Sequence, residues 1–343
     1  VRLAHLCSDF PKDELRPHAK VESVQTRLIS GTSLSYYIVC RQYFGAFVQG
    51  QLDTWQQSGM CPGICVYSDW TRLHMELQQK GDKCFDGDFK AFDASEQPSL
   101  LAHIVNTIND WYDDGEENRR IREVLWLDLI HSRHIGGRGL DQRYIYQWNK
   151  SLPSGHFLTA TVNSIFSMFC LVYAFVRATG SFDFHTHVRA FTLGDDNISN
   201  ITDDISGVFN QCAVAKYVAE LGLIYTAGKK DAELTPYSTL SDCTFLKRAF
   251  VVDRGVVLCP LELDSFLYIS YYTRKNNPTE IRAICIENIE FALEELSMHQ
   301  KEVWDAHAPL LAGLMKQLHA VPREEVTQKA YRRMVLLRTS NHW

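Results

Sequence analysis

The sequence predicts an α+β fold with a helical C-terminal lobe. Strand-like segments and helices are mixed through the middle of the chain. The clearest local pattern has residues 188–193 and 198–201 flanking Gly194-Asp-Asp-Asn197, which predicts strand, tight turn, strand. From Leu263 onward the pattern is almost wholly helical. Mixed elements followed by helices alone are typical of this fold class.

The first half of the chain is expected to alternate helices with one short strand. Apolar residues recur every three to four positions over 32–44 and 66–80, which predicts two helices. The run 84–89 predicts a strand, and a helix is expected over 98–112. Residues 136–153 mix Gly, Arg, Gln, Tyr and Trp, and an irregular insertion is expected there.

The second half contains two predicted hairpins between helices. A long apolar helix is expected over 159–179, and another helix over 208–221. Residues 244–250 and 251–258 predict a second hairpin around Asp253-Arg-Gly255. No internal repeat or low-complexity tract is present, so solenoids and linker arrays are excluded.

Length and composition indicate a globular protein. The chain has 343 residues, enough for two or three domains or one multi-lobed enzyme, with 45% hydrophobic and 22% charged residues. The longest nearly apolar stretch, 165–176, is too short to span a bilayer, and residues 1–11 lack the apolar core of a secretory signal. The first residue is not Met, so the chain is expected to start inside a longer translation product.

Cysteine and histidine spacing does not favour a zinc site. The ten cysteines show no paired rhythm, and the close pair Cys61 and Cys65 has no second pair at zinc spacing. Thiols in a reducing compartment are the favoured interpretation. His185 with His187 on a strand, or His131 with His134 one helical turn apart, could hold a metal, but such pairs are more often polar surface residues.

The distribution of charge is more informative than the net charge of −6, which by itself counts against a nucleic-acid binder. Basic residues gather near both ends of the chain, with acidic residues between them. This arrangement suits a polyanion channel leading to a metal site, and solvated helix faces explain it equally well. The basic residues are Lys12, Arg16, Lys20, Arg27, Lys329, Arg332, Arg333 and Arg338.

Two aspartates are placed to hold cations. Asp88 ends a predicted strand, and Asp195 lies at the tip of the predicted hairpin. Carboxylates on rigid strands can hold two Mg²⁺ ions, an arrangement that supports in-line displacement at phosphorus. Asp196 follows in sequence and points elsewhere, so it is expected to assist. The Gly-Asp-Asp turn alone is weak evidence, because Asp-rich turns are common for steric reasons.

Six segments in order make the pattern specific. Together they resemble the motifs of RNA-dependent RNA polymerases of picorna-like positive-strand RNA viruses (picornavirus-, dicistrovirus- and marnavirus-like). The resemblance covers residues 12 to about 250. The segments are Lys12-Asp-Glu-Leu-Arg16 with Lys20 and Thr26-Arg-Leu-Ile29; Asp88-Phe-Lys-Ala-Phe-Asp93; Pro153-Ser-Gly-His-Phe-Leu-Thr159 with Asn163-Ser164; Thr192-Leu-Gly-Asp-Asp-Asn197; Thr226-Ala-Gly-Lys-Lys230; and Thr244-Phe-Leu-Lys-Arg248.

The resemblance implies roles for the basic segment and for the ribose. Arg27, with Arg16 and Lys20 and with Lys12 in the same segment, is expected to grip the incoming triphosphate. Asp93 and Asn163, with Ser154 or Thr159, are expected to bind the ribose 2′-hydroxyl, and a sugar lacking it would leave these groups unpaired.

The remaining roles concern catalysis and the RNA strands. Asp88, Asp195 and Asp196 are expected to bind two Mg²⁺, for which Mn²⁺ can substitute. Gly155 is expected to allow backbone flexing beside the template. Lys230 is the expected general acid for the pyrophosphate. Lys247 and Arg248 are expected to hold the primer phosphates.

The resemblance also implies a right-hand architecture of fingers, palm and thumb. The expected divisions are partial fingers over 1–45, palm over 46–135, a fingers insertion over 136–152, palm over 153–253 and thumb over 254–343. Leu193 stands where the family commonly has Tyr, and Gln25 where many members have a basic residue. Only residues 1–11 precede the basic segment, so the N-terminal fingers region of the family is expected to be absent.

The expected activity is template-directed RNA synthesis in viral genome replication, from a chain released from a polyprotein. Expected partners are RNA template and primer, NTPs, a protein primer and other viral replication proteins. The expected location is the host cytoplasm, at membrane-associated replication complexes. All of these follow from the resemblance alone.

Two alternatives stay open at this level. A reverse transcriptase-like polymerase shares the palm-type fold, but it normally has an aromatic gate where Asp93 stands. A catalytically idle palm-fold RNA-binding protein would bind RNA without metal-dependent chemistry. Preference for deoxyribonucleotides would identify the first, and metal binding unaffected by Asp195→Asn would identify the second.

Overall fold

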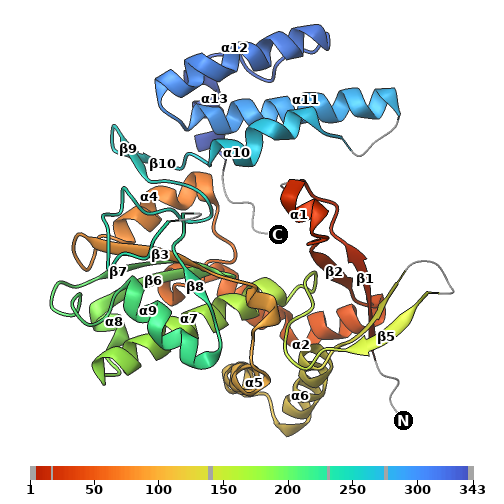
Figure 1. Ribbon diagram of the computed structural model, residues 1–343, viewed down its shortest axis with the longest axis vertical. Helices are drawn as coiled ribbons and strands as arrows, with labels where there is room; N and C mark the ends of the chain where they lie inside the picture. The colour runs from red at the N-terminus through yellow and green to blue at the C-terminus, as the bar shows by residue number, and fades with distance from the viewer. Residues whose placement is uncertain (1–4, 17, 138–141, 230–231, 274–276, 339–343) are drawn as a thin grey trace.

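The α+β class is confirmed by a computed structural model, which describes residues 5–16, 18–137, 142–229, 232–273 and 277–338. Figure 1 shows three groups of elements: a helical group at the top, a sheet with its helices on the right, and a second sheet with its helices at the lower left. The basic segment, the central sheet and the helical lobe of the sequence correspond to these groups.

The central sheet carries the aspartates. Its strands are β3 (Lys83–Phe89), β6 (Val188–Leu193), β7 (Asp196–Ile201) and β8 (Tyr225–Thr226), in the order β6-β7-β3-β8. All neighbours are antiparallel, with Leu193 paired to Asp196 at the hairpin turn and Gly87 paired to Asn197. The turn therefore lies beside the end of β3.

Helices cover both faces of this sheet. One face packs on α7 (Thr159–Thr179) and α9 (Gln211–Val218), within a core that also includes Phe85, Phe89 and Phe166. The other face packs on α4 (Val66–Glu76) through a second core. The remaining elements of the two sheet groups are α2 (Leu34–Asp53), α3 (Trp55–Ser58), η1 (Phe92–Ala94), α5 (Pro98–Tyr112), α6 (Glu116–Ile130), α8 (Phe184–His187) and η2 (Ala219–Leu221).

Helix α7 is long and apolar enough to cross a membrane by length and composition alone. It is a core element in this fold, because 56% of its most apolar window is buried inside the protein. Phe166, Cys170 and Phe175 on this helix all lie within the first core. Burial among protein side chains accounts for its apolar character.

A second sheet carries the basic segment. Strands β1 (Leu6–Pro11), β2 (Leu28–Gly31), β4 (Arg133–Gly136) and β5 (Tyr144–Gln147) form it in the order β2-β1-β4-β5, and β1 runs parallel to β4. The short helix α1 (His18–Glu22) lies between β1 and β2. Strand β5 falls within the segment that was predicted to be irregular.

The C-terminal lobe is helical, as predicted, and has its own core. Phe266, Leu293, Trp304 and Tyr331 are among its buried residues. The lobe contains α10 (Leu263–Phe266), η3 (Leu267–Tyr271), α11 (Pro278–Ser297), α12 (Lys301–Gln317) and α13 (Gln328–Leu336). The hairpin β9 (Val251–Asp253) and β10 (Val256–Leu258) precedes it, and Figure 1 shows this hairpin on the side away from β1 and β2.

Further predicted elements differ in the structure, and the helix expected over 32–44 continues to Asp53. The helix expected over 208–221 begins at Gln211, because Asn210 caps it by accepting a hydrogen bond from the Ala213 backbone N–H. Residues 244–250 were expected to form a strand, but Phe245 and Arg248 pair with each other across a tight turn. Only β9 and β10 form the second hairpin.

Candidate active site

Asp88 and Asp195 meet at the end of the central sheet. Asp88 is the penultimate residue of β3, and Asp195 lies in the turn between β6 and β7. Gly194 has φ +66°, the left-handed conformation that such a turn needs at this position. Helix α7 holds the turn in place, because the Ser164 hydroxyl on this helix accepts a hydrogen bond from the Gly194 N–H at 2.9 Å.

The two carboxyl groups interact directly. Burial raises the pKa of both Asp88 and Asp195, although both residues reach solvent through the cavity described below. The negative charge of Asp88 raises the pKa of Asp195 further. Two facing carboxylates are suited to hold a divalent cation between protein and ligand oxygens, because the cation offsets the charge that one places on the other. The donor set therefore fits Mg²⁺ or Mn²⁺.

Asp196, the neighbour of Asp195, binds a backbone amide. Its Oδ2 accepts a hydrogen bond from the Leu246 N–H at 2.6 Å, and burial raises its pKa to about 8. In the part of the chain that the structure describes, no three His, Cys, Asp or Glu side chains converge on one metal position. Metal ligation by Asp196 stays a prediction, and its observed contact is with a backbone amide.

Asp93 and Asn163 contact each other, as the sequence predicted. Asp93 lies in η1, just after Ala91 turns the chain with φ +52°, and Asn163 lies on α7. The Asn163 Nδ2 donates to Asp93 Oδ1 at 2.6 Å, while the Asn163 Oδ1 is buried without a partner. Burial raises the pKa of Asp93, the bond from Asn163 opposes this, and the charge of Arg27 also lowers it.

The loop before α7 approaches β2 closely. Gly155 has φ +117°, and a Cβ at this position would lie 3.2 Å from the Ser30 carbonyl oxygen and from Ile29 Cγ2. The Ser154 carbonyl accepts from the Ser30 N–H at 2.7 Å, and the Thr159 hydroxyl donates to the Pro153 carbonyl at 2.9 Å. Only glycine suits residue 155, so its role includes close packing against the basic segment.

Glu14 gathers the basic side chains, which the sequence analysis did not predict. Its oxygens lie 3.3 Å from Lys12 Nζ, 3.3 Å from Arg16 Nε and 3.6 Å from Arg27 Nη1. Lys20 is exposed on α1 and forms no such pair among the described residues. The only sequence signal for Glu14 was its position among cations.

One cavity of about 770 Å³ brings these groups together. The charge of Arg27 lowers the pKa of both Asp93 and Asp195, so the basic segment faces both aspartates. Burial raises these two pKa values by more than Arg27 lowers them. Lys12 does not border the cavity; it pairs with Glu14, which in turn pairs with Arg16 and Arg27 of the cavity wall. The predicted residues that line the cavity are Arg16, Lys20, Arg27, Asp88, Asp93, Ser154 and Asp195.

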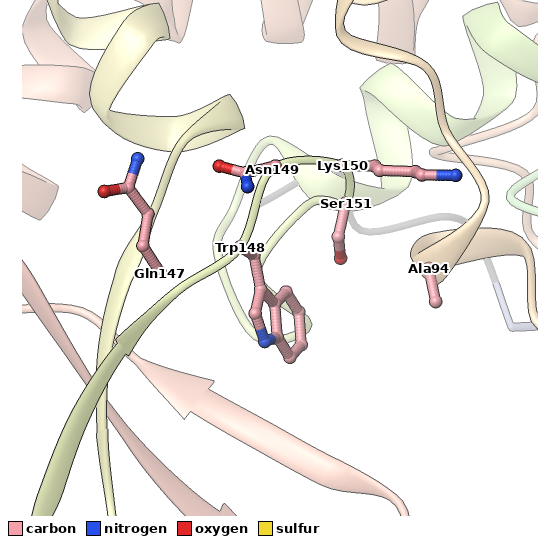
Figure 2. Close-up of a pocket in the computed structure, with 6 residues that line it drawn as sticks. All are labelled: Ala94, Gln147, Trp148, Asn149, Lys150 and Ser151. Atoms are coloured by element: carbon pink, nitrogen blue, oxygen red, sulfur yellow. The ribbon is translucent and has the colours of Figure 1, made fainter.

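Trp148 extends this cavity and was missed in the sequence. Trp148 and Ser151 line both the large cavity and a neighbouring one of about 320 Å³. Figure 2 shows the segment that runs from Gln147 to Ser151 around the smaller cavity, with Ala94 on the side toward which the Lys150 side chain extends. The Trp148 ring stacks on His134 at 4.4 Å between centroids, which fixes its position.

The prediction that Arg248 binds primer phosphates is wrong. Its guanidinium group is buried and donates to both carboxylate oxygens of Glu295 on α11, at 2.7 and 2.8 Å, and to the Cys259 carbonyl. A side chain committed to a buried bidentate pair cannot also reach RNA. Lys247, at the tip of the same turn, is exposed, and its charge lowers the pKa of Asp88, although burial has the larger, opposite effect.

Lys230, the expected general acid, lies outside the described residues. The neighbouring Lys229 is exposed, and its charge lowers the pKa of Asp86, again against a larger raising effect of burial. The role of Lys230 therefore stays a prediction.

The histidine pairs do not have the geometry expected from the sequence. His131 follows the end of α6 whereas His134 lies on β4, so they share no helical face. His134 is buried, with Nδ1 2.9 Å from Asp9 Oδ1 and Nε2 2.7 Å from the Ser132 hydroxyl. His185 and His187 lie on the short helix α8 instead of a strand. All ten cysteines are free thiols.

Comparison with known proteins identifies similar sequences over nearly the whole chain. The family model described as viral RNA-dependent RNA polymerase matches residues 1–312. The replicase polyprotein of acute bee paralysis virus (strain Rothamsted) is 31% identical over 329 residues, covering 91% of this chain and 17% of that polyprotein. The genome polyprotein of rice tungro spherical virus (strain Vt6) is 31% identical over 91% of this chain and 9% of the polyprotein.

A solved structure shares the fold. The Sicinivirus 3Dpol RNA-dependent RNA polymerase superposes with a TM-score of 0.76 at 18% sequence identity, over 93% of this chain and 64% of that one. The likeness confirms the predicted right-hand architecture. The chain spans under two thirds of the length of that structure and under a fifth of the two polyproteins.

Proposed function

Because the chain belongs to the viral RNA-dependent RNA polymerase family, we propose that it catalyses template-directed RNA synthesis by two-metal nucleotidyl transfer. The observation that carries the proposal is the cavity of about 770 Å³. It is lined by the facing pair Asp88 and Asp195, by Asp93 and by the basic residues Arg16, Lys20 and Arg27, around one nucleotide-sized space. Each group matches one part of a nucleoside triphosphate.

Asp88 and Asp195 would hold the divalent cations. When bound, two such ions activate the attacking 3′-hydroxyl and stabilise the charge on the leaving pyrophosphate. Asp196 would support the site by holding the backbone at Leu246. The family uses divalent metals in general, and two Mg²⁺ ions, replaceable by Mn²⁺, are the proposed set.

The basic segment would hold the triphosphate. Arg16, Lys20 and Arg27 supply the donors that line the cavity, and guanidinium groups bind phosphate oxygens in pairs. Glu14 orients Arg16 and Arg27 and offsets part of their charge before the nucleotide binds. The phosphates would then compete with one carboxylate for these cations.

Asp93 and Asn163 would select ribose. The short bond between them leaves the second Asp93 oxygen and the buried Asn163 Oδ1 to meet a 2′-hydroxyl. A deoxyribose would leave these polar groups unpaired, which costs free energy in a buried site. This arrangement favours RNA synthesis over the reverse transcriptase alternative.

Lys247 and Trp148 would contact the bound RNA. Lys247 is exposed on the turn before β9 and its charge acts on Asp88, so it can bind a primer phosphate there. The flat ring of Trp148 borders the nucleotide cavity and can stack on a base. RNA template, primer and NTPs are thus the proposed partners. Release from a polyprotein and a protein primer belong to the same proposal.

Primer extension on an RNA template tests the function. The wild-type chain should extend an RNA primer with NTPs and Mg²⁺, and Asp195→Asn should abolish extension. Asp110→Asn, a carboxylate paired with Arg119 on the surface, serves as the matched control and should retain activity. Extension that prefers dNTPs would support the reverse transcriptase alternative. RNA binding without any extension would support the idle RNA-binding alternative.

A further inference from the structure

The turn between Phe245 and Arg248 has a strained backbone. Phe245 and Arg248 exchange two backbone hydrogen bonds of 3.0 and 2.9 Å, so Leu246 and Lys247 form a two-residue loop. Both have positive φ, +54° and +59°. A two-residue loop with two left-handed residues normally uses Asn-Gly, because a branched or long side chain resists this conformation. The turn therefore needs external support.

Two carboxylates of the central sheet supply that support. Asp86 Oδ2 accepts from the Thr244 N–H at 2.7 Å and from the Thr244 hydroxyl at 3.0 Å, directly before the turn. Asp196 Oδ2 accepts from the Leu246 N–H within the turn. Asp86 is 8% exposed and lies two residues before Asp88 on β3, so both side chains project from the same face of the strand.

Asp86 also contacts the turn that follows β8. A Cβ on Gly228 would lie 2.5 Å from Asp86 Oδ2, so this turn passes against the carboxylate only because residue 228 lacks a side chain. Burial raises the pKa of Asp86, and the bonds from Thr244 and the charge of Lys229 oppose that shift. The backbone carbonyl of Asp86 accepts from Gln211 Nε2 at 2.7 Å, which fixes its strand to α9.

We propose that Asp86 is a positioning residue for the polymerase reaction, which holds the 244–248 turn so that Lys247 faces the metal-binding end of β3. The inference rests on the proposed function. It assigns to Asp86 no contact with substrate, and its effect is transmitted through Thr244 and the turn. Exposed Lys247 is the group that would meet the primer, and its charge acts on Asp88.

Hydrogen exchange tests the positioning without any activity. In the RNA-free protein, Asp86→Ala should increase amide exchange over 244–248 by about tenfold, because it removes both bonds to Thr244. Glu76→Ala is the matched control: Glu76 is a half-buried carboxylate of the same lobe, bound to Arg189, and should leave exchange at 244–248 unchanged. Unchanged exchange in Asp86→Ala would overturn the proposal.

A double-mutant cycle with Lys247→Ala tests the route of the effect. Asp86→Ala should raise the KM for primer–template about tenfold and leave the KM for NTP within about twofold. In a Lys247→Ala background, Asp86→Ala should raise the KM for primer–template little further, because both changes act through the Lys247 side chain. If the two substitutions instead raise this KM by the product of their separate effects, Asp86 does not act through Lys247. Asp86→Asn, which keeps an acceptor oxygen, should recover most of the affinity for primer.

A milder variant covers the case in which Asp86→Ala unfolds. Thr244→Val keeps the backbone N–H and removes only the hydroxyl bond to Asp86. It should raise the primer–template KM about threefold, again without effect in the Lys247→Ala background, and a normal KM would count against the proposal. If the wild-type chain extends no primer, the proposed function fails, while hydrogen exchange still decides the positioning.

Discussion

Removing the Asn163 amide should reduce the choice of ribose over deoxyribose. Asn163→Ala deletes the 2.6 Å bond to Asp93 Oδ1 and the buried Oδ1 that has no protein partner. A hydrogen bond to a charged group contributes about 1.5–3 kcal/mol. At about 1.4 kcal/mol per tenfold, the ratio of kcat/KM for NTP over dNTP should fall by roughly 10- to 150-fold.

Single-nucleotide primer extension measures this ratio directly. ATP and dATP opposite the same template base are compared, and the loss should lie mainly in kcat/KM for ATP. Ser167→Ala is the matched control, because Ser167 is one turn further along α7 and its buried hydroxyl also has no partner. If Asn163→Ala keeps the wild-type ratio, or Ser167→Ala lowers it equally, Asp93 and Asn163 do not read the sugar.

Three further predictions concern stability and pH. Glu295→Gln should lower the free energy of unfolding by about 3–5 kcal/mol in chemical denaturation, because it leaves the buried Arg248 charge uncompensated, and a loss below about 1 kcal/mol would contradict this. Gly155→Ala should lower the free energy of unfolding by about 1–2 kcal/mol because of the φ of +117° alone, and by more because the added Cβ crowds Ser30. A melting temperature equal to that of the wild type would contradict this prediction. The pKa of Asp196 is raised from 3.8 to about 8, so the native state binds more protons than the unfolded state between these values. Without divalent cations, stability should therefore fall as pH rises from about 4 to about 8, and Asp196→Asn should flatten this fall; an unchanged slope would argue against the shift.

The parts of the fold that the sequence predicted are those with local signals. Helices α5 and α7 have clear apolar periodicity, and the β6–β7 hairpin has Gly194 at its turn. The second sheet could not be predicted, because its strands are only four to six residues long and β1 pairs with a strand far along the chain. Short strands with distant partners have no periodic pattern of their own.

The candidate site divides in the same way. Asp88, Asp93, Asn163 and Asp195 follow from motif order. The structure brings the three aspartates to one cavity and places Asn163 behind Asp93, to which it donates a hydrogen bond. Arg248 was misassigned because its sequence position says nothing of Glu295, 47 residues further on. Asp86 had no sequence signal at all, since its partner Thr244 is 158 residues away. A residue whose role depends on a distant backbone amide is visible only in three dimensions.

The parallel pairing of β1 with β4 affects the order in which the chain folds. Asp9 on β1 and His134 on β4 are hydrogen-bonded across 125 residues, and strand β3 with helices α1 to α6 lies between them in the sequence. Before β4 is made, β1 and β2 form only a two-stranded hairpin, which is marginal in water. Closing so long a loop lowers the conformational entropy of the chain, which opposes the pairing of β1 with β4. During synthesis, the basic segment would thus leave the ribosome well before β4, and it would gain a fixed place only once β4 has been made.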